Sequence, residues 1–582
     1  MLSHPRREYA VSSALLVGFA VFALLWLVNV RYRRVYVPRL DDVTALADGL
    51  LLLPGARWED WFTRGHAHFF DAYPEWPWGL SGFVRPVFQF AIYLAHFILG
   101  RDWASYLAIN YLSVAGPAAV AFTIARTVLG LGIGLSLVTA SLVLLSPAVL
   151  EFSIWEVGFG SEPLAALFVG CAFLAVAARR YPLCFLLLMV ALLTKETAIW
   201  APLAAVLTAL VRAGRRRTLV AATMLLPLAL WLAFRFTFFG GIGGTYASPH
   251  YAPLVDALEV IGWKLTHLHQ LLVARDYSVT AGRWLLVDRA ARIGSALLVP
   301  TLLILWGWRG LRATIDCISA ALRERRPPEA DNALLVTLWG AMGLTFYFAL
   351  TLPDLRYGTS AVMFLWPAVI GEMAKHGGRR LLQFGLAGCL ALSVVGASHL
   401  VIEMNPPPEQ SNTSQLFKAV VAMNEALRQV PTGIHQVFVL SAGDDLSDVA
   451  PEYVQAFLDV PLEIVRVIDV DWDCKGAGDR IAFDHASRDG IVSLSAMLPD
   501  CAQFSFEAAI LDSRLLVDGR LRRSETISYD LPEAHPVEHR DIRSQVFDLG
   551  RRMTAHIRPQ GPARFIIEHA GPDGALVWFD FP

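Results

Sequence analysis

The sequence is poor in charged residues and lacks the short motifs that mark most soluble nucleotide, metal or redox enzymes. Only 17% of its 582 residues are Asp, Glu, Lys or Arg, whereas soluble domains average about 25%. No Gly-rich phosphate loop follows a predicted strand, and neither a CxxC pair nor an HExxH run occurs. The net charge of -2 gives no overall positive field, which argues against a nucleic-acid-binding protein.

Cysteine is scarce as well, with 6 residues in the chain. Most of them lie in or beside apolar stretches, where cysteine behaves as a small apolar side chain: Cys171, Cys184, Cys317 and Cys389. Cys474 and Cys501 lie in the polar C-terminal part and could pair if that part is extracytoplasmic. The sequence leaves this pairing open.

Long apolar stretches dominate the chain, whose residues are 55% hydrophobic and whose mean hydropathy is +0.48. A membrane-spanning helix needs about 20 such residues, and on this rule the sequence predicts about eleven spans. The predicted spans are 11–30, 104–125, 129–150, 163–178, 182–194, 198–211, 218–239, 293–308, 333–352, 359–374 and 381–401. No small-residue cleavage motif follows the first span, so we interpret it as an uncleaved anchor.

Arginine and lysine predict the orientation of these spans. With the N-terminus in the cytoplasm, the basic loops fall inside: Arg126, Arg179-Arg180, Arg212 with Arg215 to Arg217, Arg323 to Arg326, and Lys375 with Arg379-Arg380. The cluster from Arg31 to Arg39 is the exception, since it lies outside. The same alternation predicts outward segments at 31–103, at 240–292 and after 401.

The sequence changes character near residue 401, which predicts a transmembrane domain over 1–401 and a soluble periplasmic α/β domain over 402–582. Asn405-Pro406-Pro407-Pro408 is typical of a stiff linker. The expected elements beyond it are a helix at 415–429, strands at 436–441, 462–470 and 491–497, and a hairpin over 564–581.

Adjacent carboxylates, Asp41 and Asp42, follow the first predicted span. Because Asp is a common N-cap residue and 43–53 has a helical pattern, capping is one interpretation. The pair could instead deprotonate an acceptor hydroxyl or hold a divalent cation.

Further charged residues lie at the outward ends of later spans. Arg85-Pro86 begins an amphipathic segment, 86–100, which predicts an interfacial helix. Lys195 and Glu196 either form an ion pair that closes a helix end or contact a phosphate. Arg356, beside Tyr357, either holds a phosphate with its fork of donors or extends to the lipid headgroups.

The order of these features resembles the GT-C superfamily of membrane glycosyltransferases. The resemblance covers roughly residues 1–400 and rests on the acidic pair, on Arg85-Pro86, on Lys195-Glu196 and on Leu355-Arg356-Tyr357. That superfamily includes protein O-mannosyltransferases and lipid A aminoarabinose transferases. The HPPLGK-like element of the mannosyltransferases and the WWD-type motif of oligosaccharyltransferases are both absent. The sequence therefore selects no single family within the superfamily.

The resemblance implies transfer of a sugar from a polyprenyl-phosphate-linked donor to a glycan, lipid or protein acceptor, with inversion, on the outer face of a bacterial inner membrane. It implies Asp41 or Asp42 as the general base, with or without Mg or Mn. The candidate substrate-binding residues are Arg85, Glu156, Glu162, Lys195, Glu196, Arg356 and Tyr357, and capping of span ends is the alternative for Glu156 and Glu162. The 240–292 loop could form a mobile flap over the donor. A transporter or flippase of lipid-linked glycans and a non-catalytic assembly subunit remain alternatives.

The arginine bias generates a prediction about topology. Because basic loops stay in the cytoplasm, we expect an alkaline phosphatase fused after residue 582 to be active and one fused in the 309–331 loop to be inactive. A reporter that fluoresces only in the cytoplasm gives the matched control at both positions. Fluorescence at the C-terminal fusion would overturn the topology and the outward placement of Asp41.

Overall fold

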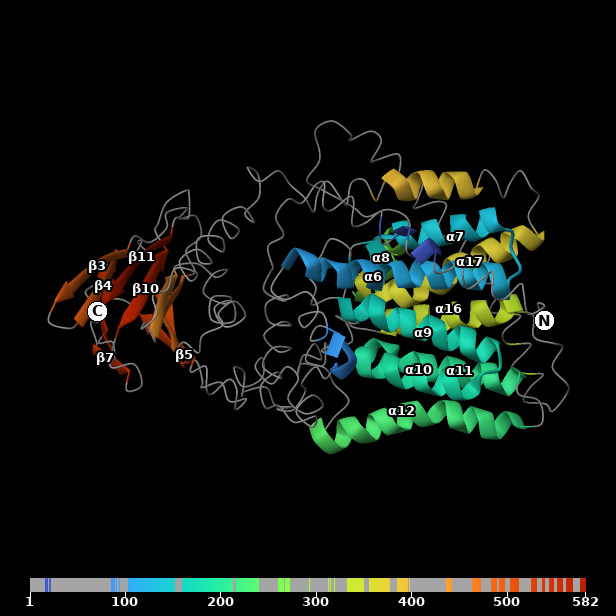
Figure 1. The fold of residues 1–582 in the computed structure, drawn as a ribbon, viewed down its shortest axis with the longest axis horizontal. Helices are drawn as coiled ribbons and strands as arrows, with labels where there is room; N and C mark the ends of the chain where they lie inside the picture. The colour runs from blue at the N-terminus through green and yellow to red at the C-terminus, as the bar shows by residue number, and fades with distance from the viewer. Residues whose placement is uncertain are drawn as a thin grey trace. The chain divides into compact units, whose positions relative to one another are not determined.

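The fold is described from a computed structural model of the chain. The described residues are most of 103–239, parts of 16–23 and 85–94, most of 260–272, residues 332–349, 355–376, most of 385–397, single positions between 293 and 319, and the strands between 436 and 581. The described residues up to 397 fall in one compact unit and those from 436 onward in another. The elements of the first unit are helices and those of the second are strands (Figure 1).

The helices of the first unit lie side by side along a common direction (Figure 1). The long ones are α6 (Trp103–Thr123), α7 (Ile133–Leu145), α9 (Ser161–Ala177), α10 (Tyr181–Thr194), α11 (Trp200–Arg212), α12 (Arg217–Phe239), α16 (Asn332–Ala349) and α17 (Thr359–His376). The short ones are η1 (Ile124–Val128), α8 (Pro147–Leu150), η4 (Glu196–Ile199), α14 (Leu268–Leu272) and η6 (Leu355–Gly358). Most follow the predicted apolar stretches to within a few residues.

Three of these helices are long and apolar enough to cross a membrane: Asn110–Val128, Arg217–Thr237 and Asn332–Ala349. They match the predicted spans 104–125, 218–239 and 333–352. Shorter apolar helices stand at four others among the described residues, Ile133–Leu145, Ser161–Ala177, Tyr181–Thr194 and Gly385–Val395. Nearly all of the predicted span 293–308 lies outside the described residues, so the full number of spans stays a prediction.

The predicted span 129–150 is interrupted, and its sequence explains why. Ser146 precedes Pro147, and a residue before proline is pushed out of the helical region by the proline ring. Ser146 accordingly has φ -64° and ψ 132°, which ends α7, and Pro147 begins α8. The Ser146 hydroxyl lies 2.7 Å from the Leu142 carbonyl oxygen and accepts a hydrogen bond from Trp366 Nε1 at 3.0 Å, so the break is held by α17.

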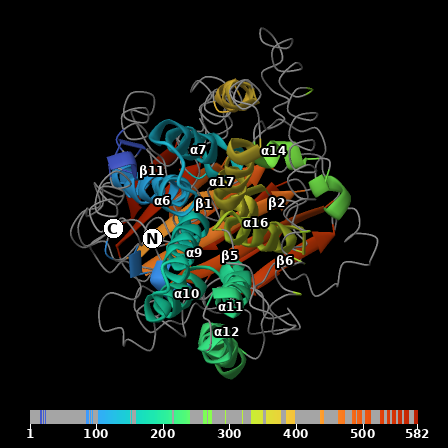
Figure 2. The ribbon, with the colours of Figure 1, turned by 90° about the vertical axis from the view of Figure 1, so that its right-hand side faces the viewer.

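Small residues let the helices approach closely around α9, which lies among α6, α10, α11 and α17 in the end-on view (Figure 2). A Cβ atom at Gly170 would lie 2.5 Å from Val120 Cγ1 and 2.9 Å from Met363 Sδ, so α6 and α17 occupy that space. Close approach of this kind is typical of packed helices in membranes. Edge-to-face rings fill the neighbouring layer, with Phe173 at 5.3 Å from Trp339.

At one end of the bundle, arginine side chains bind backbone carbonyls. Arg212 donates from Nη1 to Ala177 O at 2.6 Å and from Nη2 to Asn332 Oδ1. Asn332 in turn donates to Val128 O at 2.8 Å. These bonds satisfy orphan carbonyls at helix C-termini. They join η1, α9, α11 and α16 at the end that the sequence predicts to be cytoplasmic.

The second unit contains two sheets, with strand orders β11-β10-β1-β2-β5-β6 and β3-β4-β9-β8-β7. The strands are β1 (Gln436–Ser441), β2 (Glu463–Trp472), β3 (Phe483–Arg488), β4 (Ile491–Met497), β5 (Gln503–Leu511), β6 (Glu525–Asp530), β7 (Pro536–His539), β8 (Ser544–Asp548), β9 (Arg552–Ile557), β10 (Ala563–Glu568) and β11 (Leu576–Phe581). β1 pairs in parallel with β2 and β10, and the remaining pairs are antiparallel.

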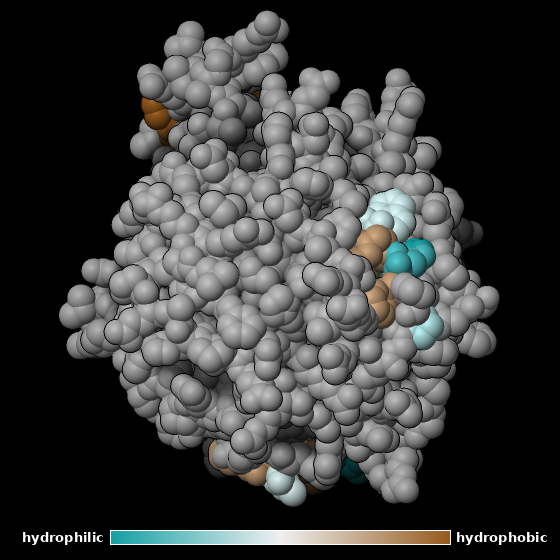
Figure 3. Space-filling model, turned by 90° about the vertical axis from the view of Figure 1, so that its left-hand side faces the viewer, coloured by the Kyte–Doolittle hydropathy of each residue, from teal (hydrophilic) through white to brown (hydrophobic). Residues whose placement is uncertain are grey.

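The predicted strands 436–441, 462–470 and 491–497 are confirmed as β1, β2 and β4, and the predicted hairpin is the antiparallel pair β10–β11. The remaining strands were not predicted, and the expected helix 415–429 lies outside the described residues. The hairpin is fixed by a bidentate ion pair between Arg564 and Asp580, at 2.6 and 2.8 Å, and by stacked Phe565 and Phe579 rings 5.1 Å apart. Figure 3 shows a face on which the described side chains mix hydrophilic and hydrophobic groups.

Candidate functional site

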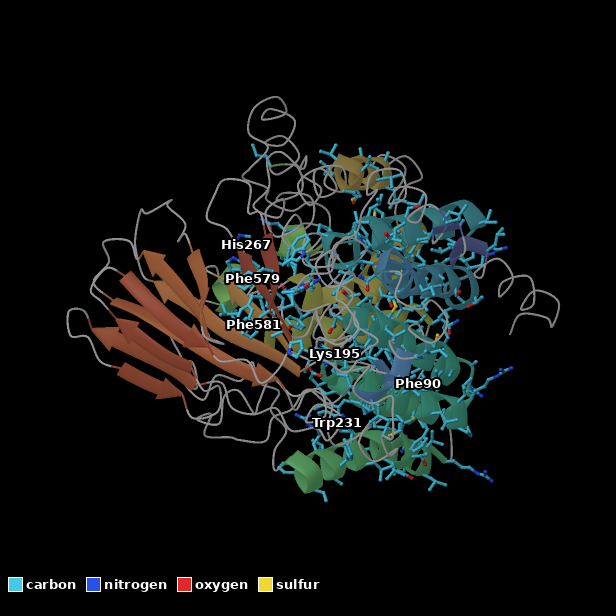
Figure 4. All side chains as sticks on the ribbon, turned by 60° about the vertical axis from the view of Figure 1, so that its left-hand side comes forward. Phe90, Lys195, Trp231, His267, Phe579 and Phe581 are labelled. Atoms are coloured by element: carbon cyan, nitrogen blue, oxygen red, sulfur yellow. The ribbon has the colours of Figure 1, made fainter. Side chains whose placement is uncertain are left out.

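At the end of the bundle opposite Arg212, short turns carry a cluster of charged side chains. The contributing elements are the chain just before the helical positions 86–94, the first turn of α9, the turn η4 between α10 and α11, and the turn η6 before α17. The cluster residues are Arg85, Glu162, Lys195, Glu196, Thr197, Arg356 and Tyr357. Figure 4 labels Lys195 and, on flanking elements, Phe90, Trp231 and His267.

Local geometry places Lys195 and Glu196 at a corner of the chain. Helix α10 ends at Thr194, and Lys195 is extended with φ -157° and ψ 134°. The turn η4 then begins at Glu196, and α11 follows from Trp200. Because the chain reverses between two helices, both side chains are held at the helix ends rather than along a helix face.

The Glu196 carboxylate is shared between two cations. Arg85 donates from Nη2 to Oε1 at 2.9 Å and from Nε to Oε2 at 3.3 Å, which is the bidentate geometry that guanidinium and carboxylate favour. Lys195 Nζ lies 3.9 Å from Oε1 of the same group. The side chains of Arg85 and Lys195 are 9% and 5% exposed. One carboxylate therefore faces two nearly buried positive charges.

Glu162 adds a second carboxylate to the cluster. Its Oε2 accepts a hydrogen bond from Thr197 Oγ1 at 2.7 Å, which joins α9 to η4. Its Oε1 is buried and has no hydrogen-bond partner in the described part of the chain. A buried carboxylate oxygen without a partner is costly, and such atoms in native structures call for an explanation such as a ligand.

The turn η6 brings Tyr357 and Arg356 to the same place. Lys195 Nζ lies 5.7 Å from the centroid of the Tyr357 ring, within the range of a cation–π interaction. The charge of Arg356 acts on Lys195 as well. Residues distant in sequence, Lys195 and Arg356, thus belong to one site.

Arg235 is a further buried arginine whose charge interacts with this cluster, and the sequence reasoning missed it. It lies in α12, is 3% exposed, and its guanidinium lies 5.7 Å from the Trp231 ring. Glu196 and Arg85 both act on it electrostatically. An arginine inside an apolar stretch is itself a signal of function, and this one could have been found in the predicted span 218–239.

Burial and neighbouring charges shift the ionisation of the turn residues. Burial, reinforced by Arg85, lowers the pKa of Lys195 to about 8. Burial acts to raise the pKa of Glu196, but the charges of Arg85 and Lys195 outweigh it, so the pKa of Glu196 is held well below its usual range. Glu196 is therefore a carboxylate at any physiological pH, whereas Lys195 loses its proton just above neutrality.

The structure brings together most of the predicted substrate-binding residues. Asp41, Asp42 and Glu156 lie outside the described residues, as do Gly243 to Tyr246 of the expected flap. Among the residues that the structure does describe, no group of three or more His, Cys, Asp or Glu side chains could hold a metal ion. The base and the Mg or Mn expected at Asp41 and Asp42 stay predictions.

No protein-family model matches the chain, and no curated protein matches it either. Among solved structures, the chain resembles ArnT from Cupriavidus metallidurans bound to undecaprenyl phosphate, with 14% identity, 77% of this chain and 85% of that chain covered, and a TM-score of 0.43. It also resembles the apo state of that protein, with 16% identity, coverage of 78% and 86%, and a TM-score of 0.44.

The lowered pKa of Lys195 gives a test of anion binding. The ammonium is charged below a pH of about 8 and neutral above it, so affinity for a short-chain prenyl phosphate should fall between pH 7 and pH 9. The second ionisation of a phosphate monoester lies near pH 6, so the ligand's charge is constant over that range. Titration calorimetry of the purified protein in detergent, repeated across this range, measures how the affinity for prenyl phosphate changes with pH.

Lys195→Arg is the matched control, because a guanidinium stays charged throughout this range. We expect the affinity of this variant for prenyl phosphate to depend less on pH than that of the wild type. An equal slope in the wild type and in Lys195→Arg would show that Lys195 does not hold the anion.

Proposed function

We propose that this chain is a membrane glycosyltransferase of the GT-C type. It transfers a sugar from a polyprenyl-phosphate-linked donor to a glycan, lipid or protein hydroxyl on the extracytoplasmic face of a bacterial inner membrane. The observation that carries this proposal is the cluster of buried cations at one end of the helical unit, where Arg85 and Lys195 share the carboxylate of Glu196. The 402–582 domain would then be periplasmic.

The charge balance of the site favours an anionic ligand. Arg85, Lys195, Arg235 and Arg356 outnumber Glu162 and Glu196 among the described residues of the cluster. Burial of charge costs several kcal/mol and is recovered only through well-placed partners, so a cluster of this kind favours ligands that carry negative charge. A phosphate group does so and accepts several hydrogen bonds from arginine at once.

This charge balance also suits the reaction. The donor is a phosphodiester with one negative charge, and the departing polyprenyl phosphate carries a second as its C–O bond breaks. Groups that bind the more highly charged state more tightly lower the barrier. Because the leaving group is a phosphate, the reaction needs no general acid at the glycosidic oxygen.

The remaining step is activation of the acceptor. Asp41 or Asp42 removes the proton of the acceptor hydroxyl while that oxygen bonds to the anomeric carbon, and the electron pair of the old bond leaves on the phosphate oxygen. One displacement of this kind inverts the anomeric carbon. A divalent cation on the same pair of carboxylates would polarise the phosphate.

A transporter or flippase of lipid-linked glycans is the second candidate, because it shares the helices and an anion-binding cluster. Transporters place ionisable groups near the middle of the bilayer at broken helices. Here Lys195 and Glu196 lie at the junction of α10 and α11, and Arg356 at the start of α17, which favours chemistry at the membrane surface. A non-catalytic assembly subunit would have no need of the Asp pair.

The test offers the purified protein a panel of radiolabelled polyprenyl-phosphate sugars together with extracts of envelope lipids and glycans. Transfer of label to an acceptor, with release of polyprenyl phosphate, supports the proposal. Movement of intact donor across proteoliposomes without transfer would identify a flippase. Neither activity with any member of the panel would favour the assembly subunit.

The Asp pair generates a prediction about catalysis. If one carboxylate is the base, Asp41→Asn or Asp42→Asn should lower turnover by about 10²–10⁴-fold, because an amide cannot accept the proton. Asp48→Asn, in the same segment, is the matched control and should retain wild-type turnover. Full activity in both Asp41→Asn and Asp42→Asn would leave the pair with the capping role alone.

Arg356 generates a prediction about donor binding. A guanidinium can hold two phosphate oxygens, whereas an ammonium offers a point charge. Arg356→Lys should raise the apparent KM for the donor and Arg356→Ala should raise it further, by roughly ten- to a hundredfold, which is the cost of a lost charge-assisted contact. A donor titration at saturating acceptor measures the change.

Arg216→Ala controls for loss of a positive charge. Arg216 is exposed and directly precedes the first residue of α12, at the end of that helix away from Arg235. Its donor curve should match the wild type. An unchanged curve for Arg356→Ala as well would mean that the phosphate is bound elsewhere, with Lys195 and the cluster from Arg31 to Arg39 as the next candidates.

A further inference from the structure

Residues 260–272 form a partly buried segment within the predicted outward loop 240–292. The helical positions 260–265 and α14 place Lys264 and Leu271 in full burial, both at 0% exposure, and Leu272 at 3%. A loop normally runs over the surface, because its own backbone cannot satisfy its polar groups inside. This part of the loop is therefore built into the unit, and its contacts show where it acts.

The first contact is a steric one between Leu271 and Gly358. A Cβ atom at Gly358 would lie 2.2 Å from Leu271 Cδ1, which is closer than any real Cβ contact. The leucine side chain thus occupies the space where another residue's side chain would begin. Gly358 is the last residue of η6 and directly follows Tyr357.

Hydrogen bonds tie the same region to the break between α7 and α8. The Ser146 hydroxyl lies 2.9 Å from Leu272 O, and the Thr359 hydroxyl lies 2.6 Å from Ala148 O and 2.8 Å from Arg356 O. Each hydroxyl has a single hydrogen to donate, which is shared between the carbonyls around it. Helix α14, the α7–α8 corner and η6 are thereby held in one arrangement.

A contact between Lys264 and Tyr347 ties the segment to the end of α16. Lys264 donates from Nζ to Tyr347 O at 2.6 Å, and the same ammonium lies 4.6 Å from the centroid of the Tyr347 ring. Tyr347 belongs to the last turn of α16, which precedes the 350–354 connection to η6. Residues 260–272 therefore hold the chain on both sides of that connection.

We propose that the 260–272 segment positions Arg356 and Tyr357 for the phosphate of the donor. The contact that does this is the one between the Leu271 side chain and Gly358. This inference rests on the proposed function. Because η6 has only 4 residues, a displacement of Gly358 moves Arg356 and the ring that faces Lys195. Leu271 and Gly358 touch no substrate and act through the residues beside them.

The test is a size exchange at this contact. Gly358→Ala introduces a methyl group where Leu271 already lies, so either η6 or the leucine side chain must shift. If η6 shifts, as the proposal requires, the contact of Arg356 with the phosphate weakens and the apparent KM for the donor should rise about ten- to a hundredfold. The value of kcat at saturating donor should change less than threefold. Leu271→Ala in the Gly358→Ala background frees the space and should restore the KM to within about threefold of the wild type, a coupling expected of residues in contact and not of distant, independent sites.

Gly134→Ala is the matched control, because nothing lies within 4 Å of a Cβ atom placed there, and its KM should equal that of the wild type. The thermal unfolding midpoint of each variant in detergent separates misplacement from loss of fold. A folded Gly358→Ala variant with an unchanged KM, or one whose raised KM persists in the double variant, would overturn the positioning role.

If Gly358→Ala does not fold, Leu271→Ala alone decides. Loss of the leucine removes the contact from the other side, so the donor KM should rise severalfold at unchanged kcat, and an unchanged KM would overturn the proposal. Failure of the proposed function is distinguished by the wild type, which would then consume no donor at all. A wild type that transfers sugar while its Gly358 and Leu271 variants keep their KM refutes this inference alone.

Discussion

The ion pair between Arg85 and Glu196 is the interaction on which the site depends. Burial of a carboxylate or guanidinium costs several kcal/mol, and this cost is recovered only with good geometry and further hydrogen bonds. The two contacts at 2.9 and 3.3 Å provide that geometry. Once Glu196 is fixed in this way, Lys195 can remain beside it as a buried ammonium. Because Glu196 is the first residue of η4, the ion pair also holds the start of that turn.

The two ends of the helical unit use arginine in different ways. At one end Arg212 donates to the Ala177 carbonyl and to Asn332, so its charge is spread over neutral acceptors that need hydrogen bonds anyway. At the other end Arg85 and Lys195 compete for one carboxylate. The candidate site lies at this second end, where buried cations surround a carboxylate rather than neutral acceptors.

The length of the apolar stretches allowed much of the helical unit to be predicted from the sequence. Spans such as 218–239 and 333–352 are long continuous runs, and periodicity needs no tertiary information to find them. The Ser146–Pro147 break was missed, although the proline gives a direct signal. The pairing of Arg85 with Glu196, 111 residues apart, could not be predicted, because only the packed helices bring those turns together. Arg235 was missed because the span 218–239 was identified from its overall hydropathy, which a single charged residue hardly changes.

Two of the segments that carry the site are single turns of 3-10 helix between long helices, Glu196–Ile199 and Leu355–Gly358. Short turns of this kind are frequent connectors between helices, and their hydrogen bonds have poorer geometry than those of α-helices. Each turn has its own anchor, Arg85 for η4 and Leu271 for η6. The cation–π contact between Lys195 and Tyr357 is the direct link between them. Since such a contact contributes only about 0.5–2 kcal/mol, it is too weak to set the geometry of the site alone, so the ion pair at η4 and the proposed contact of Leu271 with η6 supply the constraint that it lacks.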